Sequence, residues 1–83
     1  MELVKINFTI DYEKRIEELG LTFLVNYIML PVNPPKYQLQ AKVFSRGFEI
    51  TKDLEEKVRK IIPSHYPYEG KEYPVQLSFS ANI

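Results

Sequence analysis

The side chains that could carry out catalysis or bind a metal are few and scattered along this chain. Its 83 residues include one histidine, His65, and no cysteine. Ser64 precedes it, but nucleophilic catalysis needs a positioned base and an orienting group, which adjacency in sequence does not supply. A zinc or iron site needs about three or four converging ligands, which one histidine without cysteine does not favour. Glu69 and Glu72 are a candidate pair of carboxylates for acid–base catalysis, but they are interpreted as solvated loop charges. We therefore expect no enzymatic activity, metal, cofactor or small-molecule substrate.

A cluster of tyrosines between the last predicted helix and the last predicted strand is a candidate contact for another protein. The candidate loop residues are His65, Tyr66, Tyr68 and Lys71, with Tyr73 close by. Tyrosine gives a large contact area at low cost in entropy and is enriched in binding hot spots. The alternative is that two of the three tyrosines pack over the end of a helix and leave only their hydroxyls in water.

The first element that must position these residues has two interpretations. Residues 3–10 alternate between apolar and polar side chains, which predicts a strand with Val4, Ile6, Phe8 and Ile10 on one face. A short helix capped by Asp11 would follow and end at Gly20. Because the even-numbered apolar alternation continues through residue 16, a long first strand in a hairpin remains an alternative for residues 11–20.

The other elements have clearer patterns. Residues 21–30 form a strand that is apolar on both sides, so we expect it to be covered on both sides, by this chain or by another copy. Residues 37–45 alternate as a strand, and Thr51 caps a helix that Pro63 ends. This helix has the apolar stripe Leu54, Val58, Ile61 and Ile62. The last strand carries inward side chains at the odd positions 73–81.

These elements predict one α+β domain over residues 1–83, in the order β-α-β-β-α-β. The expected architecture is ferredoxin-like, with two helices on one face of a four-stranded antiparallel or mixed sheet. The alternative is a three-stranded meander, one helix and a returning strand. In both arrangements one face of the sheet has no helix over it.

The outward face of this sheet suggests two functions. The first is a homodimer formed through the strand at residues 21–30 and the open face. Its candidate interface residues are Leu24, Ile28, Leu30 and Phe44. The alternative is single-stranded nucleic-acid binding, which sheet platforms achieve with positive charge and stacking aromatics. Its candidate contacts are Lys5, Lys42, Phe44 and Arg46. The plain alternative to both is that the amides and hydroxyls of this face are simply solvated.

Composition limits the class of protein. Eleven basic and eleven acidic residues give a net charge of zero, which argues against a strongly basic nucleic-acid coat. The longest apolar run, residues 21–32, is too short to cross a bilayer. Together with the absence of cysteine, this predicts a cytoplasmic protein without a membrane partner. Six prolines against three glycines, and helices rich in Glu and Lys, suggest a thermophilic character.

Overall fold

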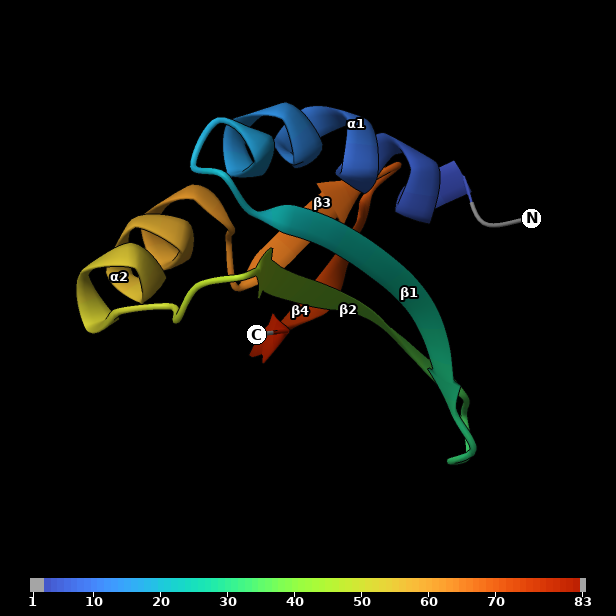
Figure 1. Ribbon diagram of the computed structural model, residues 1–83. Coiled ribbons are helices and arrows are strands. Elements are labelled where there is room, and N and C mark those ends of the chain that lie inside the picture. The colour runs from blue at the N-terminus through green and yellow to red at the C-terminus, as the bar shows by residue number, and fades with distance from the viewer. Residues whose placement is uncertain (1–2, 83) are drawn as a thin grey trace.

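Two helices lie on one face of a four-stranded sheet in the computed structural model, which describes residues 3–82 (Figure 1). The elements along the chain are α1 (Leu3–Glu17), β1 (Thr22–Leu30), β2 (Lys36–Arg46), α2 (Lys52–Ile61), β3 (His65–Tyr68) and β4 (Lys71–Asn82). The predicted α+β class, with two helices over a four-stranded sheet, is confirmed.

The sheet is mixed and has the strand order β1-β2-β4-β3. β1 and β2 form an antiparallel hairpin, and β3 and β4 form a second one. The two hairpins join through β2 and β4, which run parallel. A parallel pair needs a long crossover connection, and α2 and β3 lie in the segment that makes it. β1 is therefore an edge strand along its whole length.

The first segment of the chain differs from the prediction. Residues 3–10 are not a strand, and Asp11 does not cap a helix, because residues 3–17 form the single helix α1. Val4, Phe8 and Ile16 are buried at multiples of four residues, which is a helical stripe. The chain order is therefore α-β-β-α-β-β rather than β-α-β-β-α-β, and residues 11–20 belong to no long hairpin.

The fourth strand comes instead from the segment predicted as a tyrosine-containing loop. Residues 65–68 form β3 and pair with residues 71–74 of β4. The tight turn between them has positive φ angles at Glu69 (48°) and Gly70 (79°), a conformation that glycine adopts easily. The number of strands was therefore predicted correctly although one of them lies elsewhere in the chain.

Helix α2 forms as its sequence predicts. The side chain of Thr51 accepts a hydrogen bond from the Leu54 N–H at 3.2 Å, which satisfies a backbone donor that the helix leaves free. Val58 is fully buried, and the Ile62 N–H closes the last turn on the Val58 carbonyl. The stripe of α2 thus faces the sheet.

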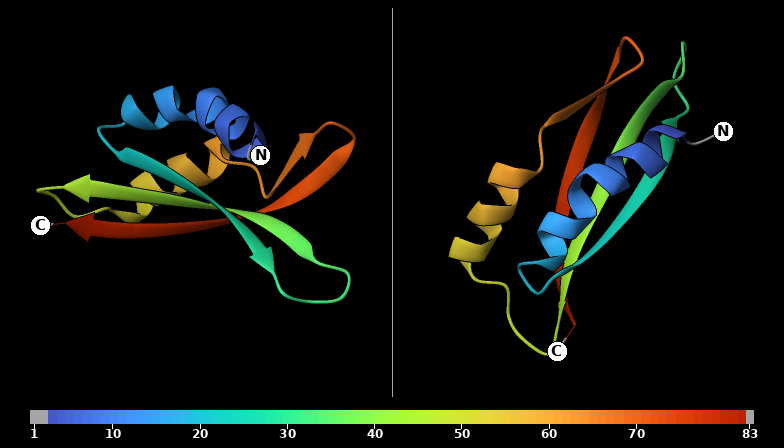
Figure 2. Two further views of the ribbon diagram at one scale, coloured as in Figure 1. Left: turned by 90° about the vertical axis from the view of Figure 1, so that its right-hand side faces the viewer. Right: turned by 90° about the horizontal axis from the view of Figure 1, so that it is seen from above.

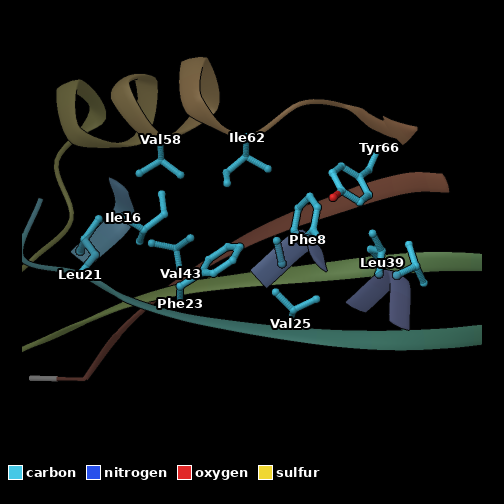
Figure 3. Packing of buried hydrophobic residues seen from close by; sticks show 12 residues of the cluster. Phe8, Ile16, Leu21, Phe23, Val25, Leu39, Val43, Val58, Ile62 and Tyr66 are labelled. Atoms are coloured by element: carbon cyan, nitrogen blue, oxygen red, sulfur yellow. The ribbon is translucent and has the colours of Figure 1, made fainter. Parts of the chain in front are cut away.

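The core lies between the two helices and the covered face of the sheet (Figure 3). Phe8 of α1 is completely buried, with its ring centroid 5.0 Å from that of Tyr66 and 5.9 Å from that of Phe23. Val43 of β2 and Val58 of α2 are buried in the same cluster. The two helices and the sheet therefore share one core. Within residues 3–82, neither helix is long and apolar enough to span a membrane.

Candidate functional site

The face of the sheet turned away from the helices is called the open face here. Phe23 and Val25 of β1 and the odd residues 39–45 of β2 are buried on the covered side, so their even-numbered neighbours point the other way. The strand register then sets out rows across the open face. Three rows are Thr22–Phe44–Ser80, Leu24–Lys42–Ser78 and Asn26–Gln40–Gln76.

An apolar stripe runs along β1 on the open face. It consists of Leu24, Ile28 and Leu30 and is called the edge stripe. Leu24 and Leu30 are 49% and 37% exposed, and Ile28 is half-buried. Phe44 of β2 pairs with Thr22 of β1, so it lies one strand further into the sheet, and it is also half-buried. The structure thus brings the four predicted interface residues to one face, and three of them to its edge.

The second side of this strand, which we expect to be covered by this chain or by another copy, has no cover from the described residues. Helix α1 and the core cover its inner face, whereas no element of residues 3–82 covers the edge stripe. Moreover, residues 22–30 contain no charged side chain and no proline. Natural edge strands usually carry such residues, because they discourage pairing with another chain.

The centre of the open face is neutral and hydrogen-bonded. The side-chain oxygen of Gln76 accepts bonds from the amides of Gln38 at 3.3 Å and Gln40 at 3.4 Å. These bonds join β2 to β4 on the surface. A shallow hollow of about 520 Å³ lies beside them, lined by Lys42, Phe44, Ser78, Ser80 and Ala81.

The four predicted nucleic-acid contacts do not share one face. Lys42 and Phe44 lie together at the hollow, and Arg46 ends the same strand with the same parity. Lys5, however, belongs to α1, on the helical side of the sheet. The prediction that Lys5 and Lys42 share a face is therefore wrong, because it depended on a strand at residues 3–10.

The tyrosine cluster is mostly part of the core. Tyr66 is 7% exposed, and its hydroxyl donates to Oδ2 of Asp11 at 2.5 Å. The Tyr68 hydroxyl accepts a bond from the Asn7 side-chain amide at 3.3 Å. Burial, helped by the hydrogen bond to Asp11, raises the pKa of Tyr66 far above its usual range. Of the predicted partner contacts, only His65 and Lys71 are in the exposed class. Tyr66 instead holds α1 against the hairpin through its hydrogen bond to Asp11.

The side chains of Ser64 and His65 are in contact at the surface. Ser64 Oγ and His65 Nδ1 are 3.2 Å from each other, and both residues are exposed. Within residues 3–82, no three His, Asp or Glu side chains gather into a metal site.

A second free edge of the sheet was not predicted from the sequence. It is the second half of β4, since β3 pairs only with residues 71–74. The signal for it is the uneven composition of the strand, because Lys71, Glu72 and Pro74 all lie in the paired half.

Comparison of this chain with protein-family models, with curated proteins and with solved structures gave no match.

Proposed function

We propose that this protein is a small, non-enzymatic interaction module that forms a homodimer through the edge strand β1 and the adjoining open face. The observation that carries the proposal is the edge stripe of Leu24, Ile28 and Leu30 on an uncharged, proline-free strand at the rim of the sheet. The lack of cysteine fits the reducing cytoplasm, which we propose as its location.

Pairing along this edge would satisfy the free backbone groups of β1 and bury its exposed apolar side chains at the same time. An added strand supplies partners for backbone groups along the edge, while the apolar side chains are withdrawn from water at roughly 25 cal/mol per Å² of buried area. A small domain gains most from such burial, since its own core is limited.

The edge stripe can also pack against the edge stripe of a second copy of the chain. In an antiparallel pair centred on Asn26, Leu24 of each copy would lie beside Ile28 of the other, on the same face of a continuous sheet. Since β1 has no charge, self-pairing brings no like charges together along the strand. Phe44, one strand inward, would border the new apolar band.

Nucleic-acid binding by the open face has weaker support. The face retains Lys42, Arg46 and the single aromatic Phe44, and the hollow beside Lys42 could receive a base. Lys5, however, lies on the helical side of the sheet, so the open face has one predicted phosphate contact fewer.

Light scattering tests the dimer. We expect a mass of about twice 9.8 kDa at micromolar concentration. Leu24→Lys places a charge in the apolar band and should give a folded monomer, as judged by an unchanged circular dichroism spectrum. Ser78→Lys, in the same row but two strands away, is the matched control and should remain dimeric. A wild-type monomer at high concentration, or equal effects of both lysines, would contradict pairing through β1.

A further inference from the structure

The second half of β4 is an open sheet edge on the side opposite to β1. On one side, β2 pairs with β4 from Val75 to Asn82. On the other side, β3 reaches only as far as Pro74, and the Val75 N–H donates to the Ser64 carbonyl at 2.9 Å. Beyond Val75, no backbone hydrogen bond joins this side of β4 to another segment of residues 3–82.

The direction of the Val75 N–H shows which groups are available. In a strand, the N–H and C=O of alternate residues point to the same side. Because the Val75 N–H points away from β2, the N–H and C=O groups of Leu77, Phe79 and Ala81 point to the open edge. The side chains of Leu77 and Phe79 lie on the helical face, where they are half-buried.

This edge lacks the usual protection against pairing. The charges and the proline of β4 are Lys71, Glu72 and Pro74, and all three lie where β3 already covers the strand. Residues 75–82 contain neither a charge nor a proline. Charges and prolines are the common means of blocking an edge, so this half of β4 is built to accept a strand.

A groove lies directly beside the edge. It has a volume of about 490 Å³ and runs between the end of α2 and β4, with Ile61, Ile62, Pro63 and Leu77 among its lining residues. Figure 2 shows α2 running alongside β4 at this edge of the sheet. A strand added to β4 would place every second side chain on this face, next to the groove.

The charge of the groove indicates the chemistry of its occupant. Its lining includes Arg59 and Lys60 and no acidic residue. The Arg59 guanidinium lies 5.2 Å from the centre of the Phe79 ring, so a cation–π contact holds it over the edge strand. Opposite charge on a partner would aid both encounter and register.

We propose that residues 75–82 of β4 and the adjacent groove bind an extended peptide segment of another protein by strand addition. The segment has apolar side chains at alternate positions, which enter the groove, and an acidic residue near its end, which meets Arg59 and Lys60. This site is separate from the β1 interface, since the two free edges bound the sheet on opposite sides.

Titration with a fluorescein-labelled peptide of sequence Glu-Val-Thr-Val-Thr-Val-Glu tests the proposal. We expect saturable binding with a Kd of roughly micromolar order. Hydrogen exchange followed by NMR should show slowed exchange of the Leu77 and Phe79 amides and no change along β1. The same peptide with proline at its central valine cannot complete the ladder and should not bind. Absence of binding at millimolar peptide, or protection of β1 instead, would overturn the proposal.

A charge exchange tests the groove itself. Arg59→Glu should weaken binding of the acidic peptide by roughly three- to tenfold and strengthen binding of a matched peptide with lysine at both ends. Lys57→Glu makes the same change in net charge on the same helix, outside the groove, and should leave both affinities nearly unchanged. Equal effects of the two variants would show general charge attraction and would refute a specific site.

A second copy of the chain is the competing occupant. It would protect the Leu77 and Phe79 amides without peptide and in proportion to protein concentration, which would overturn the proposal. Using the Leu24→Lys variant for these titrations separates the two interfaces, because the peptide should still bind when the β1 dimer is lost.

Discussion

The hydroxyl of Tyr66 on β3 donates a hydrogen bond to the carboxylate of Asp11 in the middle of α1, over 2.5 Å. The same ring packs edge-on against Phe8, at 5.0 Å between centroids. No strand pairing holds α1, so side chains must fix it in place. Tyr66 does this from the hairpin, with Tyr68 and Asn7 making a second link at 3.3 Å.

Tyr66 should make stability depend on pH in alkaline solution. Its pKa is raised in the folded protein, so above about pH 10 the unfolded chain loses this proton while the folded chain keeps it. The contribution of this hydroxyl to the free energy of unfolding is therefore expected to be complete below that pH and to be lost as the pH rises further. Tyr66→Phe should cost about 1 kcal/mol at neutral pH and flatten the alkaline decline.

Urea denaturation at a series of pH values measures this effect. Tyr37→Phe is the control, because Tyr37 is an exposed tyrosine, 41% accessible. Its alkaline profile should follow that of the wild type. If Tyr66→Phe declined as steeply as Tyr37→Phe, the hydroxyl would not be the titrating group.

The helical phase of α1 can be tested with two apolar residues that a strand would place on one face. Phe8 is fully buried and Ile10 is 70% exposed. Phe8→Ala should therefore cost about 3–5 kcal/mol, whereas Ile10→Ala should change the free energy of unfolding by at most about 0.5 kcal/mol. Chemical denaturation of both variants gives the comparison. Similar losses would indicate a strand at residues 3–10.

Nucleic-acid binding by the open face makes a quantitative prediction of its own. With Lys42 and Arg46 as phosphate contacts, the log–log salt slope for a single strand would be about −1.4. Lys42→Ala would reduce it by about 0.7, and Phe44→Ala would weaken binding by about 1–3 kcal/mol with little change in slope.

We expect fluorescence anisotropy with a labelled oligonucleotide to show no binding at low salt, because the face has only three cations, Lys36, Lys42 and Arg46, and one outward aromatic. Lys5→Ala, on the helical side, is the control for any signal that does occur. A slope near −1.4 that responds to Lys42 and not to Lys5 would make nucleic-acid binding the function and the dimer secondary.

Sequence alone was sufficient wherever local signals agreed. Helix α2 has a capping Thr51, a stripe through Val58 and a terminating Pro63, so propensity, capping and periodicity all indicate one element. The alternation in β1 and β2 likewise predicts which residues face the core. From this parity alone, Leu24, Ile28 and Phe44 could be assigned to the open face.

Residues 3–10 could not be assigned in this way, because two periods fit them. Val4 and Phe8 belong both to a strand alternation and to a helical stripe that reaches Ile16. The two periods differ at Ile6 and Ile10, which a strand would bury with Val4 and Phe8. In the helix they are 51% and 70% exposed on the outer side of α1. Contacts with Phe23 and Tyr66, far along the chain, decide in favour of the helix, and Lys5 moves with it.

The two free edges were decided by the tertiary structure. Composition shows that β1 and the end of β4 are uncharged, but it does not show which strands pair with which. β3 was hidden as well, since four residues that include Pro67 resemble a loop. Which strands pair depends on contacts between residues far apart in the chain, because it is the burial of the whole sheet that favours one arrangement. Only the folded chain therefore shows that, within residues 3–82, β1 and residues 75–82 each have a neighbouring strand on one side alone.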